Sequence, residues 1–272
     1  MSLKNIEQNI NVYDFALYLK CPRKVYYLKR SEIIRPNDNV SFVEHLFLKE
    51  LGIRYPRLLE NFSSKADDMK NKIQSVFNEI SNELPTIYSS EIESVSESTI
   101  SQALNNVQAC VKDITSNMME MLTNAHNLPL LQALCSMEIE PLLYGPKMKI
   151  SGIPAGMIKL EGIPTPVIVK TGKFPEYGIW SDDRLHLAVF TMIAQEVYNT
   201  PIDNGIVIYS RSGNIRSAKI RANDRRQVLA IWSHIKKIND GFLPERKQIP
   251  MCHDCEFLQI CDVKSSLASK FF

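Results

Sequence analysis

The sequence contains no long apolar run: no stretch of its 272 residues approaches the roughly 20 apolar residues that a membrane-spanning helix requires. The first segment, MSLKNIEQNINVYDF, has no apolar core of the kind that signal peptides carry. Internal repeats, low-complexity tracts and Gly/Ser-rich linkers are also absent. We therefore expect a cytoplasmic protein with no membrane partner, folded as one large domain or as a domain with a sizeable subdomain.

The chain has six cysteines, and the placement of four of them is its most informative feature. Cys252, Cys255 and Cys261 form a C-x2-C-x5-C cluster, whereas Cys21 stands alone at the other end. In a reducing compartment such thiols suit metal binding better than disulfides. Four thiolates are a complete ligand set for a tetrahedral zinc ion or an iron–sulfur cluster. If all four bind one centre, the two ends of the chain are clamped together; alternatively, Cys21 is a small core residue.

Two further cysteines, Cys110 and Cys135, lie in apolar runs and have no partner at a metal-binding spacing. Free cysteine is among the most deeply buried residue types. We expect both to lie in the hydrophobic core.

The net charge of +2 hides an uneven distribution of charged residues. Residues 60–120 carry an excess of acidic side chains, whereas residues 211–237 are rich in basic ones and contain a single acid, Asp224. The basic members of that stretch are Arg211, Arg216, Lys219, Arg221, Arg225, Arg226, Lys236 and Lys237. A positive stripe of this kind attracts a phosphate backbone, and the alternative is an ordinary solvated helix face.

The first half of the chain has the periodicity of helices. Apolar spacing predicts helices over residues 11–30, 45–59, 65–80 and 99–125, with a polar loop that begins at Pro85. We therefore expect a helical lobe over residues 1–135, which includes the first cysteine of the proposed centre.

The second half changes to a strand-like pattern. Short strands are predicted for SMEIEPLLY, KMKISG, GMIKLEG and PVIVKTG, and helical spacing returns over residues 182–198. A Gly213-Asn214 turn predicts a hairpin over residues 205–220, followed by a final helix over residues 222–239. This order predicts an α/β (α+β) fold with one main sheet, in which residues 136–242 form the core and residues 243–272 a cysteine segment.

An ordered set of segments resembles a known family. In chain order these segments are FALYLKCPRKVYYLK, GIPAGMIKL, PVIVKTGKFPEYGIW, DDRLHLAVFTMIAQE, GIVIYS and IPMCHDCEFLQIC. Together with the split cysteines they are similar to the CRISPR-associated RecB-like exonucleases. The resemblance covers residues 11–30 and 136–264.

The resemblance implies a restriction-endonuclease-like core, of the type called PD-(D/E)XK, and a [4Fe–4S] cluster on four cysteines. It assigns the cluster to Cys21, Cys252, Cys255 and Cys261, with zinc as the alternative. It also implies a Mg²⁺- or Mn²⁺-dependent exonuclease that trims or selects DNA ends for insertion as new spacers, with a CRISPR integrase complex as partner.

The hydrolytic positions of the family are only partly kept in this chain. The resemblance places an aspartate after a Gly-x-Pro turn, where Ala155 stands, and a glutamate in the next strand, where Ile168 stands. Lys170 matches the lysine that steadies the scissile phosphate, and His45 is the candidate for the metal-binding histidine of an early helix. A methyl group cannot ligate Mg²⁺, which prefers carboxylate and water oxygens. We therefore expect an impaired hydrolytic site.

Other acids are candidate substitutes for the missing ligands. Glu138 and Glu140 are predicted to share one face of the strand that begins at Ser136. Glu161 ends a later strand, and Asp182 and Asp183 open the helix that follows, where a surface acid or a helix cap is the alternative. If two carboxylates among Glu138, Glu140 and Glu161 lie within reach of Lys170 and His45, the metal site is rebuilt and the chain is an active exonuclease with a rearranged acidic site.

Two hypotheses remain besides that one. The first, which we favour, is a DNA-binding protein with the nuclease fold, the cluster and an impaired hydrolytic site. Its candidate phosphate contacts are Lys173, Arg184, Arg216, Arg221 and Arg225, and Tyr177 and Trp180 are candidates for base stacking. The other is a zinc-stapled scaffold subunit without a nucleic-acid role, in which the acidic lobe binds a basic partner.

Overall fold

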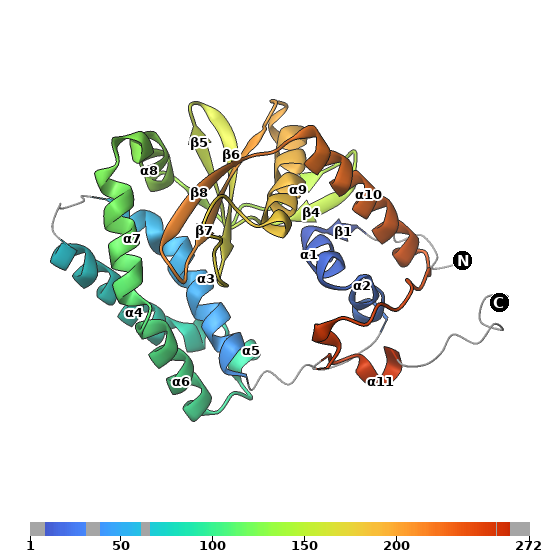
Figure 1. Ribbon diagram of the computed structural model, residues 1–272, viewed down its shortest axis with the longest axis horizontal. Helices are drawn as coiled ribbons and strands as arrows, with labels where there is room; N and C mark the ends of the chain where they lie inside the picture. The colour runs from blue at the N-terminus through green and yellow to red at the C-terminus, as the bar shows by residue number, and fades with distance from the viewer. Residues whose placement is uncertain (1–8, 31–38, 61–65, 254, 262–272) are drawn as a thin grey trace.

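The computed structural model describes residues 9–30, 39–60, 66–253 and 255–261, which form a three-layered α/β structure (Figure 1). The central layer is a five-stranded sheet with the strand order β2-β5-β6-β7-β8. These strands are β2 (Glu138–Ile139), β5 (Gly156–Leu160), β6 (Ile163–Lys170), β7 (Asn204–Tyr209) and β8 (Asn214–Lys219). β6 and β7 are parallel, and the other neighbouring pairs of this sheet are antiparallel.

Helix α9 (Ser181–Tyr198) connects the two parallel strands and covers one face of the sheet. It shares an apolar core with α1 (Val12–Lys20), α10 (Ala222–Asn239) and the side chain of Ile168. A crossover connection is needed here because a tight hairpin joins only antiparallel strands. The crossover brings the start of α9 close to the C-terminal end of β6.

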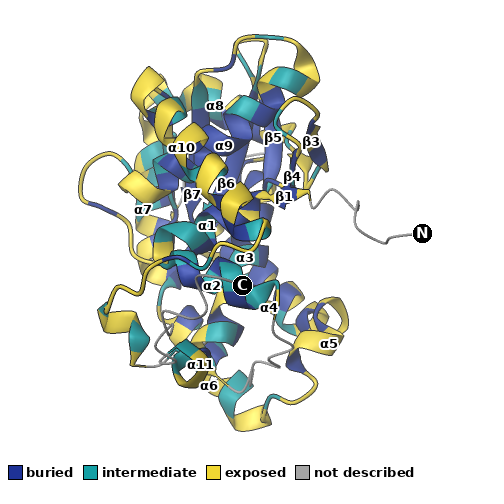
Figure 2. Cartoon of the chain, turned by 90° about the vertical axis from the view of Figure 1, so that its right-hand side faces the viewer, coloured by how far each residue is buried: buried dark blue, intermediate teal, exposed yellow. Residues whose placement is uncertain are grey.

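The opposite face of the sheet is covered by a layer of helices. These helices are α3 (Val40–Leu59), α4 (Ala66–Ile87), α5 (Ser89–Ile92), α6 (Glu97–Gln108), α7 (Val111–Thr123) and α8 (Leu128–Cys135). Val167 and Ile206 point into this second core because successive strand residues face opposite sides of a sheet. Figure 2 shows the buried strands between helices whose outer surfaces are exposed. The helical layer and the sheet therefore share one hydrophobic core.

A small sheet and both ends of the described chain lie on one side of the molecule. β1 (Ile10–Asn11) pairs in parallel with β4 (Ile150–Gly152), which pairs antiparallel with β3 (Leu143–Gly145). α2 (Pro22–Leu28) lies beside the C-terminal segment that contains α11 (Leu258–Cys261) (Figure 1). Among the described residues, no helix is long and apolar enough to cross a membrane.

The mixed α/β architecture with one main sheet confirms the predicted fold class. The last predicted helix coincides with α10, and the predicted hairpin is formed by β7 and β8. Gly213 occupies the tight turn between them with φ +77°, a backbone conformation that side chains with a Cβ rarely adopt.

Several boundaries in the helical layer differ from the predictions. Residues 11–30 form two helices because Cys21 has extended backbone (φ −163°) and Pro22 begins α2. Pro85 does not end its helix: α4 continues to Ile87, so the proline removes a hydrogen bond only in the last turn. Residues 99–125 divide between α6 and α7.

The prediction that both isolated cysteines are core residues was wrong for Cys135. Cys135 is exposed, since it follows the buried Leu134 at the end of α8, where the helix turns its next side chain to solvent. Cys110 is partly buried and packs against the core of the helical layer.

Candidate functional site

The two positions that the resemblance assigns to carboxylates lie next to each other. The antiparallel register of β5 and β6 pairs Gly156 with Val167. Continued by one residue, that register places Ala155 opposite Ile168. Ile168 is only 2% exposed and belongs to the core under α9. Both positions where the resemblance puts metal-binding carboxylates therefore carry apolar side chains.

Lys170 lies two residues beyond Ile168, on the same face of β6, and forms an ion pair with the helix that follows. Its Nζ is 3.1 Å from Oδ1 of Asp183, in the first turn of α9. The hydroxyl of Tyr209, on β7, donates a 2.8 Å hydrogen bond to Oδ2 of the same carboxylate. Burial and this bond raise the pKa of Tyr209 well above its usual range. The carboxylate of Asp183, on α9, thus binds one residue of β6 and one residue of β7.

His186 extends this network by one turn of α9. Its Nδ1 lies 3.1 Å from Nζ of Lys170, so the ammonium donates and the imidazole accepts. Burial, followed by the positive charge of Lys170, lowers the pKa of His186 to about 3. His186 is therefore neutral at physiological pH, and the lysine has one negative and one neutral partner.

His45 lies near the end of β6 but does not meet a carboxylate ligand set. It is exposed on α3, and its Nδ1 is 2.8 Å from Oγ1 of Thr171, the residue that follows Lys170. Desolvation by the surrounding protein, followed by the charges of Lys20, Lys49 and Lys170, lowers its pKa. Three nearby ammonium groups oppose the approach of a divalent cation.

The predicted common face of Glu138 and Glu140 was wrong. β2 consists only of residues 138–139, and Glu140 has a left-handed backbone with φ +47°. The turn ends the strand alternation on which the prediction depended. The carboxylate of Glu140 is 2.8 Å from Nζ of Lys49, and its backbone N–H donates to the carbonyl of Ala155. Glu140 is thus near the Ala155 position but already ion-paired.

These residues do not assemble a hydrolytic metal centre. Within the described ranges, no three side chains among His, Cys, Asp and Glu are grouped so as to hold a metal ion. The residues at this place are a lysine, two histidines, one shared aspartate and the ion-paired Glu140, and they do not fit the oxygen-rich site that Mg²⁺ or Mn²⁺ requires.

The cysteines of the predicted cluster lie where the two chain ends meet. Cys21 occupies the junction of α1 and α2, and the other three lie in the segment that packs beside α2. All four are free thiols that are partly buried. Burial raises the pKa of the Cys255 thiol, and the nearby Cys21 adds to this effect.

A set of contacts joins α2 to the C-terminal segment without any metal. The Arg23 guanidinium donates to the carbonyl of Pro244, and to the carbonyl and Sγ of Cys261, at 2.8–3.2 Å. Lys24 pairs with Glu256 at 2.9 Å. The predicted proximity of the two ends is therefore present. The donor chemistry, four free thiols around one junction, fits an iron–sulfur cluster or zinc, although the thiols are not drawn together into a closed ligand set.

The candidate phosphate contacts fall into two groups. Arg216 and Arg225 hold backbone carbonyls of the protein, and Arg184 lies 3.5 Å from the carboxylate of Asp224. Lys173 and Arg221 are not ion-paired in the described part of the chain. The second group is free to meet an anion.

Arg216 organises the loop that contains the exposed aromatic residues. It donates to the carbonyls of Pro175, Glu176 and Gly178 at 2.7, 3.2 and 2.6 Å, and its guanidinium lies 5.3 Å from the ring centre of Phe174. In this loop Tyr177 is 83% exposed and Trp180 is 49% exposed. Both rings are thus available at the surface beside the end of β6.

Sequence reasoning missed Asp183 as the partner of Lys170, and it missed Tyr209 and Arg23. The sequence identified Asp183 as a candidate substitute acid at a helix start, with a surface acid or a helix cap as the alternative, but not as the counter-charge of Lys170. Its ion pair depends on the crossover geometry. The only sequence signal for such a partner is the general rule that a charge removed from water, as Lys170 partly is, favours a counter-charge.

No protein-family model matches this sequence. The chain is 26% identical over 98 residues to a protein of Archaeoglobus fulgidus that is described as uncharacterized. The match covers 36% of this chain and 43% of that protein, so the chain spans less than half of its relative. This likeness adds neither a ligand nor a reaction.

Proposed function

We propose that this chain is a DNA-binding protein of the RecB-like nuclease type, with an iron–sulfur cluster and an impaired hydrolytic site, that acts on DNA ends in CRISPR spacer acquisition. The family resemblance supplies the biological setting, including the integrase complex as partner. The sheet order β2-β5-β6-β7-β8 with α9 as crossover is compatible with the PD-(D/E)XK core that this proposal requires.

The ion pair between Lys170 and Asp183 carries the impaired-site part of the proposal. In a metal-dependent nuclease the lysine must face a scissile phosphate held by metal-bound carboxylates. Here its counter-charge is a carboxylate of the protein itself, and its neighbours are Ile168 and His186. A lysine neutralised in this way contributes to folding rather than to charge stabilisation of a leaving group.

Binding without cleavage is supported by the surface around this place. Lys173 and Arg221 carry unpaired charges within the described part of the chain, and the loop braced by Arg216 presents the rings of Tyr177 and Trp180. Phosphates meet such cations, and unpaired bases stack on exposed aromatic rings. The substrate is therefore a DNA end with a single-stranded part.

The cluster part of the proposal depends on the four free thiols at the junction of the chain ends. A cluster there stabilises the packing of α2 against the C-terminal segment, because the free energy of metal binding contributes directly to folding. Anaerobic purification with measurement of iron, acid-labile sulfide and zinc tests this. The cluster is supported if the unmodified protein contains iron and sulfide and shows a visible absorption band, and if Cys252→Ser loses all three. Stoichiometric zinc in place of iron favours the zinc-stapled scaffold.

The function itself is tested by binding and cleavage on the same preparation. We expect fluorescently labelled single-stranded and overhang-bearing duplex DNA to bind with an affinity that falls steeply as salt rises. We expect no cleavage with Mg²⁺ or Mn²⁺. Chelator-sensitive cleavage that Lys170→Ala removes would show a rebuilt acidic site, and absence of salt-dependent binding would exclude a nucleic-acid role.

A further inference from the structure

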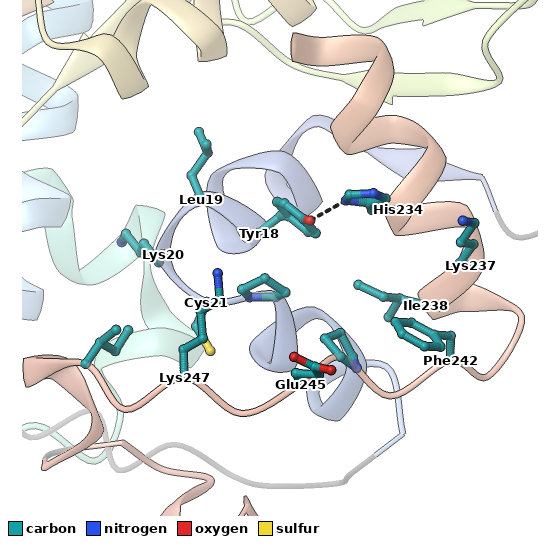
Figure 3. A pocket seen from close by; sticks show the side chains of 13 residues that line it. Tyr18, Leu19, Lys20, Cys21, His234, Lys237, Ile238, Phe242, Glu245 and Lys247 are labelled. Carbon is teal, nitrogen blue, oxygen red and sulfur yellow. Dashed lines mark hydrogen bonds between the residues drawn. The ribbon is translucent and has the colours of Figure 1, made fainter. Parts of the chain in front are cut away.

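A cavity of about 800 Å³ lies outside the sheet site, between the α1–α2 junction, the end of α10 and the segment after it (Figure 3). Its volume falls in the range of roughly 300–1,000 Å³ that is typical of small-molecule sites. It touches none of the residues at the Ala155 and Ile168 positions, but Cys21, one of the four candidate cluster ligands, is among its lining residues. The cavity therefore lies apart from the sheet site and adjoins the junction of the chain ends.

One part of the cavity wall is aromatic. The hydroxyl of Tyr18 and Nδ1 of His234 are joined by a 2.6 Å hydrogen bond, and their ring centres are 5.9 Å apart. Phe242, 57% exposed, contributes a third ring from the turn after α10 (Figure 3). Flat rings on two sides of a cavity favour a planar, unsaturated ligand over a flexible chain.

The rest of the rim is positively charged. Lys20, Lys237 and Lys247 line the cavity, with Glu245 as the acid among the lining residues. In the described part of the chain none of these three ammonium groups forms an ion pair. The three lysines are spread along the rim, with Lys20 and Lys237 at opposite ends of the cavity (Figure 3). A rim with three cations and a single acid favours an anionic ligand.

We propose that this cavity binds a nucleotide, with the base between the rings of Tyr18 and Phe242 and the phosphate at Lys247. This goes beyond the proposed function, which assigns no small-molecule ligand; the cavity adjoins the candidate cluster ligand Cys21 without depending on the cluster. The same chemistry has two sources, a free mononucleotide or the terminal nucleotide of a DNA strand. Lys20 connects the two places: it lines the cavity, and its charge also reaches His45.

The experiment is isothermal titration calorimetry with the full chain, purified anaerobically, and adenosine 5′-monophosphate as the probe. Two matched probes are used for comparison: adenosine, which lacks the phosphate, and ribose 5-phosphate, which lacks the base. We expect one site per chain. The dissociation constant of each matched probe is expected to be at least about tenfold higher than that of adenosine 5′-monophosphate, since stacking and charge both contribute to binding. A 5′-phosphorylated hexadeoxyadenylate is titrated in parallel to represent a strand end.

Phe242 and Lys247 are suitable for variants because both side chains are exposed. Phe242→Ala removes a ring and Lys247→Gln removes a charge; each is expected to weaken binding about tenfold. Lys159→Gln, an exposed lysine on β5, is the control and is expected to leave binding unchanged. Circular dichroism checks that all three variants are folded.

If the mononucleotide binds and both variants weaken its binding, the ligand is a free nucleotide. If only the hexanucleotide binds and both variants weaken its binding, the ligand is the end of a DNA strand. Equal affinity for adenosine, indifference to both variants, or no heat with either probe overturns the proposal. The proposed function is measured on long single strands and overhang-bearing duplexes, and its failure leaves a mononucleotide result intact.

Discussion

Nζ of Lys170 lies 3.1 Å from the carboxylate of Asp183, and Tyr209 donates to the other oxygen of that carboxylate. β6, β7 and α9 are thus joined at one aspartate. The side chain of Asp183 is only 10% exposed and that of Lys170 is 26% exposed. An ion pair in such a place stabilises little by itself, but removal of one partner leaves an uncompensated charge.

We predict that Asp183→Asn lowers the free energy of unfolding by about 1–3 kcal/mol, a value discounted from that of fully buried pairs because Lys170 is partly exposed. Urea denaturation measures it. Asp182→Asn, the exposed neighbour in the same helix turn, is the control and is expected to change stability by less than about 0.5 kcal/mol. Equal effects of the two substitutions would show that the pair with Lys170 does not stabilise the fold.

Arg216 is predicted to brace the aromatic loop rather than to contact DNA. Arg216→Lys replaces the planar donor fork with one ammonium group, which cannot reach three carbonyls at once. We expect faster hydrogen exchange over residues 174–180 and little change in the exchange of β7. Unchanged exchange in that loop would mean that other contacts hold it.

Arg221 is predicted to contact phosphate, in contrast to Arg216. Arg221→Gln is expected to weaken DNA binding on all sequences alike and to reduce the slope of log affinity against log salt by about one unit. Fluorescence anisotropy at several salt concentrations measures both. The matched control is Lys219→Gln, since Lys219 lies 3.6 Å from Asp203 and its charge is already compensated. Equal slopes for Arg221→Gln and the unmodified protein contradict the contact.

Much of the fold follows from local pattern. The hairpin requires a turn residue that tolerates φ +77°, and glycine at position 213 meets that need. α10 begins where Asp224 accepts a hydrogen bond from the N–H of Arg221. Such signals lie within a few residues of one another, so the sequence alone is enough to predict them.

The site could be predicted only in part, because its partners are distant in the chain. Ala155 and Ile168 were identified as departures from the resemblance, and their placement opposite each other follows from strand register. The early end of β2 was missed: Glu140 leaves the strand by a left-handed turn that no glycine marks, although Pro141, a residue disfavoured inside strands, directly follows it. The ion pair of Lys170 depends on where the crossover helix begins, which local sequence does not specify.

The depressed pKa of His186 predicts a stability change in mild acid. In the folded state the pKa is about 3, whereas an unfolded histidine has its usual pKa of about 6.5. Between these values the unfolded chain binds a proton that the folded chain does not, so stability falls as the pH falls, by up to about 1.4 kcal/mol per pH unit.

His186→Gln is expected to remove this dependence between pH 6.5 and pH 5, where most carboxylates remain ionised. Urea denaturation at several pH values gives the difference between variant and unmodified protein. His126→Gln, at an exposed histidine, is the control. The same pH slope in all three proteins would mean that His186 is accessible to protons in the folded state.

The packing of Phe257 against Tyr27 is predicted to hold the two chain ends together before any cluster is considered. Phe257 is 1% exposed, and its ring stacks on that of Tyr27 with centres 5.6 Å apart. Phe257→Ala therefore removes a buried ring and is expected to cost about 3 kcal/mol of stability, seen in urea denaturation and as faster hydrogen exchange in α2. Ile260→Ala, at an exposed side chain whose backbone carbonyl accepts from Tyr27, is the control. If the amides of α2 stay protected from exchange in metal-free Phe257→Ala, the polar contacts of Arg23 and Lys24 are sufficient to hold the ends. If this protection is lost and returns only when iron and sulfide are restored, the cluster and the aromatic stack act on the same junction.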